Sequence, residues 1–188
     1  MNTSKRISLA RITALLTFIG GTLIFLLFYF TNDSGVCFLG LGYIIIMTIV
    51  NLIVLLRLPF KEIKNKVIGN TIYKSIVLII LNIPIAITYC WFAMTLLNTV
   101  RITFVNTTQI DIDNLQISGC EEKYIHKLLS GESRTIWIKI PSDCGVSIDY
   151  KMNGQLKSES VSGYVTNEGG FIMTFKIATN QKAYDQDL

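Results

Sequence analysis

The chain has 188 residues, of which 51% are hydrophobic, and a formal net charge of +4. Residues 1–98 hold eight Lys or Arg against two Asp or Glu, a net of +6, whereas residues 99–188 hold nine against eleven, a net of −2. A nucleic-acid-binding domain needs clustered Lys and Arg, so the acidic second half excludes nucleic acid as a partner. The apolar excess of the first half indicates a membrane protein.

Three uncharged apolar runs in the first half are long enough to cross a bilayer, at about residues 12–30, 36–56 and 75–97. At roughly 1.5 Å per residue, a run of about nineteen residues covers near 28 Å, and a hydrocarbon core is about 30 Å thick. The first run could instead be a secretory signal peptide. It exceeds the usual apolar core of roughly 7–15 residues, however, and no small-x-small cleavage site follows it. We therefore expect residues 1–98 to form three transmembrane helices.

Basic residues flank these runs unevenly and predict the orientation. Those of the N-terminal flank and of the second connector (57–74) are Lys5, Arg6, Arg11, Arg57, Lys61, Lys64, Lys66 and Lys74. The first connector has none, and after the third run only Arg101 lies within about twenty residues. Short cytoplasmic segments retain Lys and Arg. The N-terminus and the 57–74 connector are therefore predicted in the cytoplasm, with the C-terminal domain on the periplasmic or extracellular side of the inner (plasma) membrane.

Small and polar side chains within the runs are candidates for helix packing: Thr13, Thr17, Gly21, Asn51 and Asn82. The first three recur every four residues, on one helix face, where small side chains allow close approach; chance spacing is the alternative. Asn51 could hydrogen-bond across helices, and Asn82 could satisfy a carbonyl freed by Pro84; we expect both to serve in packing. No ionisable side chain lies within the runs, which argues against a transport pathway.

From Val100 onward apolar and polar residues alternate with a period of two, which is typical of half-buried antiparallel strands. The predicted strands are residues 100–106, 109–118, 123–129, 134–141, 145–152, 155–165 and 170–178. Asn153-Gly154 predicts a tight hairpin, because both central residues of that turn need positive φ. The broken alternation at Asp113–Asn114 predicts a β-bulge.

Seven short strands without a helical period predict a small all-β sandwich over residues 99–180. Its layout resembles an immunoglobulin or fibronectin module, without the Cys–Trp–Cys spacing of antibody domains; a minimal barrel is the alternative. The predicted fold class is therefore a membrane-anchored α+β protein. The polar tail 181–188 is expected to be flexible.

Two of the four cysteines, Cys120 and Cys144, lie in the predicted outer domain, each at a strand end beside a glycine. In an oxidising compartment they could form a disulfide, and free thiols are the alternative. The bond would close a loop of about twenty-five residues and contribute roughly 3 kcal/mol. Cys37 and Cys90 are expected to be ordinary packing residues of the spans.

No catalytic or cofactor site is predicted. His126 is the only histidine, so a zinc site would lack ligands, and we expect its side chain on a strand surface. Glu121 and Glu122 are adjacent, so they would point to opposite faces of a strand and could not flank one substrate bond. Phosphate-binding and dinucleotide-binding motifs are absent from the sequence. Asn32 and Asn106 each begin a glycosylation sequon, which matters only in a eukaryotic host.

The leading functional hypothesis is a non-enzymatic protein-binding module anchored in the membrane. Trp137 and Tyr164 are candidate partner contacts, because large aromatics dominate interface energetics; the alternative is that they fill the core. One form of this hypothesis is a bacterial immunity protein that neutralises a toxin at the membrane. The alternatives are an accessory subunit of a larger envelope complex, whose spans would pack on other membrane subunits, and a channel or transporter subunit.

Overall fold

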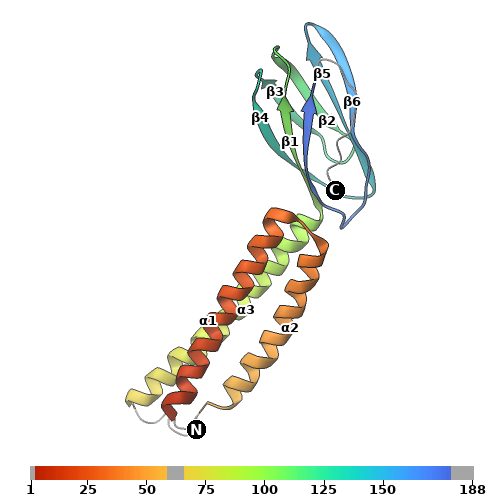
Figure 1. Cartoon of the computed structure of the whole chain (residues 1–188). Helices are drawn as coiled ribbons and strands as arrows, with labels where there is room; N and C mark the ends of the chain where they lie inside the picture. Colours follow the sequence, from red (N-terminus) through yellow and green to blue (C-terminus); the bar gives the residue numbers. More distant parts are fainter. Residues whose placement is uncertain (1–2, 59–65, 179–188) are drawn as a thin grey trace. The chain divides into compact units, whose positions relative to one another are not determined.

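The computed structural model describes residues 3–58 and 66–178 and divides the chain into two compact units, Met1–Met94 and Thr95–Leu188. Three long helices form the first unit, called here the helical unit, and α3 extends into the second (Figure 1). The second, called the β unit, contains two sheets. Three long apolar helices followed by a β-rich region agree with the predicted α+β class.

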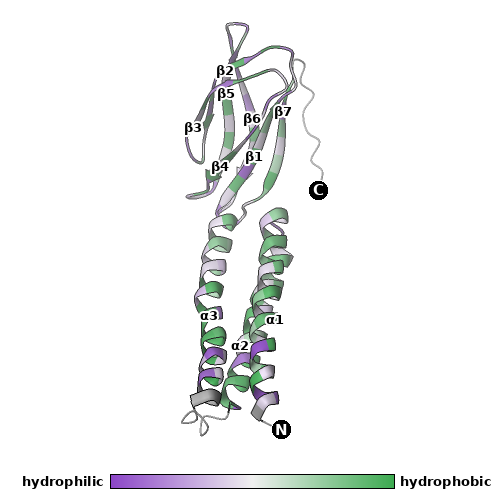
Figure 2. Ribbon diagram, turned by 90° about the vertical axis from the view of Figure 1, so that its left-hand side faces the viewer, coloured by the Kyte–Doolittle hydropathy of each residue, from purple (hydrophilic) through white to green (hydrophobic). Residues whose placement is uncertain are grey.

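The three helices are α1 (Thr3–Thr31), α2 (Ser34–Leu56) and α3 (Lys66–Leu97). Each is long and apolar enough to cross a membrane. α1 and α3 begin earlier than the apolar runs that predicted them, because helix hydrogen bonds lie within the backbone and Lys, Arg and Ser sustain them without burial. The hydrophilic colour in Figure 2 gathers at the end of the helical unit that holds the N-terminus.

A tight turn joins α1 to α2. Asn32 has a left-handed φ of 52°, and its backbone N–H donates to the Phe28 carbonyl at 2.7 Å, which closes the end of α1. Asp33 caps α2, since its carboxylate accepts from the Val36 N–H at 3.0 Å. A side-chain oxygen at this position satisfies a backbone donor that the helix itself leaves unpaired.

The β unit consists of seven strands among the described residues. They are β1 (Thr99–Asn106), β2 (Ile112–Ser118), β3 (Lys123–Leu128), β4 (Ser133–Lys139), β5 (Cys144–Met152), β6 (Gln155–Val165) and β7 (Ile172–Ile177). One sheet has the order β4-β1-β7 and the other β3-β2-β5-β6. Both sheets contribute to one apolar cluster, which includes fully buried Phe104 and Ile138 from the first and Ile117 and Ile148 from the second. All seven predicted strands are present, with ends within about three residues of the prediction.

Two local predictions are confirmed and one pairing is wrong. Asn153 and Gly154 have φ values of 53° and 76° in the β5–β6 hairpin. The β2–β5 register shifts between Asp113 and Gln116, which is the predicted bulge. In contrast, β7 runs parallel to β1, not antiparallel. The β6–β7 connection crosses between the sheets, and alternation along a strand specifies its faces but not the direction of its neighbour.

The last turn of α3, which belongs to the β unit, is fixed to the sheets by a group of backbone contacts that we call the junction. The Gly170 N–H donates to the Leu97 carbonyl at 2.7 Å, and the Ile140 N–H donates to the Asn98 carbonyl at 3.0 Å. The Glu168 N–H donates to Asn98 Oδ1 at 3.2 Å. Carbonyls at the end of a helix lack partners within it. The loop before β7 therefore caps α3.

Candidate interaction surfaces

Asn51 joins α2 to α1 inside the helical unit, as the sequence predicts. Its side chain is 8% exposed, and Nδ2 donates to Thr17 Oγ1 at 2.9 Å. The Thr17 hydroxyl in turn donates to the Thr13 carbonyl at 2.8 Å. The predicted threonine face of α1 therefore meets α2 through a side-chain amide.

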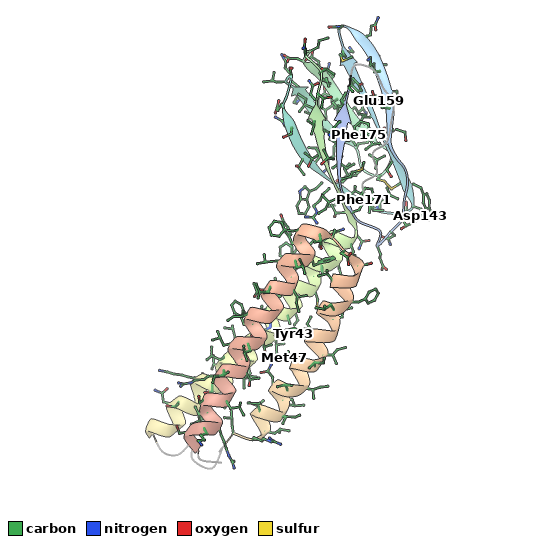
Figure 3. All side chains as sticks on the ribbon, in the orientation of Figure 1. Tyr43, Met47, Asp143, Glu159, Phe171 and Phe175 are labelled. Atoms are coloured by element: carbon green, nitrogen blue, oxygen red, sulfur yellow. A yellow bond between two sulfur atoms is a disulfide. The ribbon has the colours of Figure 1, made fainter. Side chains whose placement is uncertain are left out.

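The close approach of α1 and α2 occurs at Gly20 more than at the predicted Gly21. A Cβ atom on Gly20 would lie 2.2 Å from the Tyr43 hydroxyl oxygen, whereas one on Gly21 would lie 3.7 Å from the ring. The Tyr43 hydroxyl donates to the Leu16 carbonyl at 2.9 Å, and Figure 3 labels this side chain between the helices. The sequence offers a signal for this contact only in the Gly20-Gly21 pair, because the tyrosine lies far away along the chain.

Asn82 does not hydrogen-bond to the carbonyl that Pro84 leaves unpaired, so the suggested partner on the same helix is wrong. Its Nδ2 donates instead to the Ala14 carbonyl of α1 at 3.1 Å. The carbonyl freed by a proline belongs to the residue four positions earlier, Ile80. Residues two apart on a helix point about 200° apart, so Asn82 faces away from that group. Asn82 therefore ties α3 to α1.

Basic residues of α1, of the α2 C-cap and of α3 lie at one end of the helical unit. Arg6 Nη1 donates to the Arg57 carbonyl at 3.4 Å, and Arg11 Nε donates to Ser75 Oγ at 3.3 Å, next to exposed Lys74. Lys5 is also exposed. Lys61, Lys64 and the tail 181–188 lie outside the described residues, as does the side chain of Lys66.

Cys120 and Cys144 form a disulfide, with Cα atoms 5.2 Å apart. It joins the turn before β3 to the first residue of β5. Gly119 allows this approach: its φ is +110°, and a Cβ atom there would lie 2.0 Å from the Gly145 carbonyl oxygen. Cys37 and Cys90 are free and partly buried in the helical unit.

Trp137 and Tyr164 are both exposed, at 42% and 66%, so neither fills the core. They do not form one site, because Trp137 lies on β4 of the three-stranded sheet and Tyr164 on β6 of the other. The Tyr164 hydroxyl donates to Asp143 Oδ2 at 2.7 Å, and this bond raises the pKa of Tyr164. The carboxylate therefore holds that ring in place.

Trp137 belongs to a row of three side chains across the outward side of the sheet β4-β1-β7. Arg101 of β1 is paired with Trp137 on one side and with Ile172 of β7 on the other. The Arg101 guanidinium lies 5.4 Å from the Trp137 ring centroid, a cation–π distance, and the arginine is only 6% exposed. Ile172 is 41% exposed. Sequence reasoning missed Arg101 and Ile172, although a charge between Val100 and Ile102 marks an outward strand position.

A buried carboxylate lies on the inner side of the edge strand β6. Glu159, labelled in Figure 3, is 9% exposed. It accepts a hydrogen bond from the Tyr150 hydroxyl at one oxygen. Its other oxygen has no hydrogen-bond partner among the described residues. Burial, together with the bond to Glu159, raises the pKa of Tyr150.

The described residues contain no group of three His, Cys, Asp or Glu side chains that could hold a metal ion. His126 is exposed and packs edge-on against the Tyr124 ring, with centroids 4.7 Å apart. Glu121 accepts from the Lys139 backbone N–H at 2.8 Å and pairs with Lys123 at 3.0 Å. These side chains therefore hold local structure and do not converge on a common point.

Both asparagines of the glycosylation sequons are buried. Asn106 is 0% exposed, and its amide bonds two carbonyls and the Thr108 N–H and hydroxyl. Asn32 is 8% exposed at the end of α1. Neither amide is accessible for glycosyl transfer in the folded chain.

No protein-family model matches the chain, and no curated protein matches it. Among solved structures, the NMR structure of a protein from Eubacterium rectale is similar with 13% sequence identity, over 43% of this chain and 80% of that chain. The TM-score of this superposition is 0.34, which is too low to support an argument about fold or function.

Proposed function

We propose that the protein is a multi-pass membrane protein that holds a binding module on the outer side of the inner (plasma) membrane. Three helices of sufficient length and apolarity support the anchoring. The described basic residues Arg6, Arg11, Arg57 and Lys74 lie at one end of the helical unit, which supports a cytoplasmic position for that end. The disulfide supports an oxidising compartment for the β unit.

The module is proposed to be a sandwich with an immunoglobulin-like layout. The support comes from two sheets that share one apolar cluster, and from strands that pass repeatedly between the sheets. β3 and β4 follow each other in the chain but lie in different sheets, because β4 pairs with β1. β5 lies in the sheet of β3 again, where it pairs with β2. Such exchange is typical of Greek-key sandwiches.

The observation that carries the binding function is an exposed tryptophan held in a fixed position. The Trp137 ring contacts the Arg101 guanidinium on the outward side of the sheet. Trp137 is not one of the residues that form the buried core. Trp and Arg are the residue types most enriched at the energetic centres of protein interfaces. A rigid aromatic loses little conformational entropy on binding. The specific form we propose is an immunity protein that blocks a toxin at the membrane.

The structure gives less support to the alternative of an accessory subunit. That role was expected to use the polar side chains of the helices for packing on other membrane proteins. Thr17, Asn51 and Asn82 instead bond within the helical unit. These bonds link α1 to α2 and α3, and Asn51 Oδ1 has no partner among the described residues.

A labelling experiment tests the proposed location. Ser130→Cys and Lys64→Cys are each introduced into a chain that carries Cys37→Ala and Cys90→Ala. A membrane-impermeant maleimide applied to intact cells should label position 130, which is exposed in the β unit. Position 64 should react only after permeabilisation. The reverse pattern would overturn the proposed location.

Cross-linking in cells tests the binding function. A photo-reactive amino acid at position 137 should give one defined protein adduct, and the same amino acid at exposed Lys151, on the other sheet, should not. The immunity form predicts that co-expression protects cells from a toxin encoded next to this gene. It is abandoned if the chain is made and inserted but gives no protection.

A further inference from the structure

The outward side of the three-stranded sheet carries charge of one sign. Its charged residues are Arg101, Lys139 and Lys176, and its other outward positions are Thr, Ser, Val, Ile and Trp, without Asp or Glu. We call this surface, centred on Trp137 and Ile172, the basic face. It contrasts with the net charge of −2 over residues 99–188.

The other sheet shows a different charge pattern on its outward side. There Asp113 of β2 is paired with Lys151 of β5, and Gln116 is paired with Asp149. Opposite charges on facing strand positions compensate each other. Lys139 and Lys176 form no salt bridge with the described residues. The charge of Lys176 therefore remains for an external partner, whereas the Glu121 carboxylate, which accepts from the Lys139 backbone N–H, partly compensates the charge of Lys139.

The basic face has the composition and arrangement of an interface centre with a charged rim. Lys139 pairs with the first residue of β1, and Lys176 pairs with Val105. At about 3.3 Å per residue, the two lysines lie about 20 Å apart along the strand direction. Trp137 and Ile172 are exposed between them. An aromatic and apolar centre between polar ends is the usual order in protein interfaces.

We propose, as an extension of the protein-binding function above, that the basic face docks an acidic surface of a partner protein. An apolar side chain of the partner packs between Trp137 and Ile172, and its carboxylates pair with Lys139 and Lys176. The face spans only three strands, about 10 Å between outer strand axes, so it is smaller than the roughly 800 Å² per partner of a stable interface. Electrostatic attraction therefore supplies much of the encounter rate, and binding falls as salt rises.

The test uses the full chain in lipid nanodiscs of phosphatidylcholine. In a Trp91→Phe background Trp137 is the only tryptophan and reports directly on the basic face. The probes are a short peptide with Glu at alternate positions around a central Phe, and matched peptides with Gln or Lys in place of Glu. Titrations are made at about 20 mM and about 300 mM salt, on either side of the range over which surface charges are screened.

The Glu peptide should change Trp137 emission and bind more weakly at high salt, and the Gln and Lys peptides should bind at least tenfold more weakly. Lys139→Glu with Lys176→Glu should reduce Glu-peptide affinity by about tenfold to thirtyfold. The control Lys151→Glu, on the other sheet, should leave it within about twofold. Equal binding of the three peptides, or an equal loss in the control, would overturn the proposal.

Three outcomes separate this inference from the alternative of a lipid contact and from the proposed function. If Trp137 responds to anionic phosphatidylglycerol in the nanodisc and not to the peptide, the basic face meets lipid and the acidic-partner proposal is wrong. If position 130 is labelled from outside but the peptides do not discriminate, the location stands and the partner chemistry is wrong. If position 130 is labelled only from inside, the proposed function fails irrespective of the peptide result.

Discussion

Gly170→Ala is the most informative single substitution, because it acts on the junction alone. A Cβ atom at position 170 would lie 2.4–2.7 Å from the carbonyl oxygens of Leu96, Leu97 and Thr99. All three are backbone atoms, so no side chain can rotate away to relieve the contact. The Gly170 N–H also donates to Leu97 at 2.7 Å, and this bond must lengthen or break.

The cost combines a lost hydrogen bond of about 1 kcal/mol with a steric penalty of about 1–3 kcal/mol, or about 2–4 kcal/mol in all. For a unit of this size the melting temperature should fall by roughly 10–25 °C. Thermal unfolding in detergent, followed by Trp137 fluorescence in a Trp91→Phe background, measures it. Gly163→Ala is the matched control, because its Cβ would have no atom within 4 Å. The reasoning is refuted if Gly170→Ala melts within about 2 °C of the parent chain, or if the control falls as far.

Three further predictions concern individual contacts. Asn51→Leu removes the amide bond from α2 to α1 and should lower the unfolding free energy of the helical unit in detergent by about 1 kcal/mol; Thr48→Ala, whose hydroxyl bonds only its own helix, should not. Replacing Cys120 and Cys144 with Ser should destabilise the β unit by roughly 3 kcal/mol, and a reductant should then have no further effect on its melting. An ion pair with a lysine and a backbone N–H bond lower the pKa of Asp111. Ionised Asp111 therefore contributes to the free energy of unfolding above its unfolded-state pKa of about 3.9, and this contribution is lost as the pH falls through the folded-state pKa. Asp111→Asn should make the melting temperature less sensitive to acid.

The features that the sequence predicted are those with a local physical cause. Strand positions follow from alternation, which any half-buried strand needs. The hairpin follows from Asn153-Gly154, whose positive φ values suit that turn. The apolar runs identify three helices because an uninterrupted apolar segment of this length is typical of a helix that can span a bilayer. Each of these signals lies within a few neighbouring residues.

The features that the sequence did not predict depend on residues far apart in the chain. The parallel neighbour of β1 comes from a strand more than sixty residues later. The same connection brings Ile172 beside Arg101 and Trp137, so the basic face has no local signal. Gly170 is one of several loop glycines, and only the fold shows that three carbonyl oxygens surround it. Asn82 packs between helices as expected, but the partner suggested for it on its own helix is wrong, because its amide reaches α1 instead.

The carboxyl group of Glu159 has a consequence for the exposed edge of its sheet. β6 is the longest strand and lies at the free edge of its sheet, where its backbone offers pairing groups to any extended chain. A strand added along that edge would exclude the remaining water from a carboxylate that already has one unpartnered oxygen. Burying a carboxyl oxygen without a hydrogen-bond partner costs about 1–3 kcal/mol, which offsets part of what new strand hydrogen bonds contribute. The inward-pointing glutamate therefore opposes the addition of a further strand along this edge of the sheet.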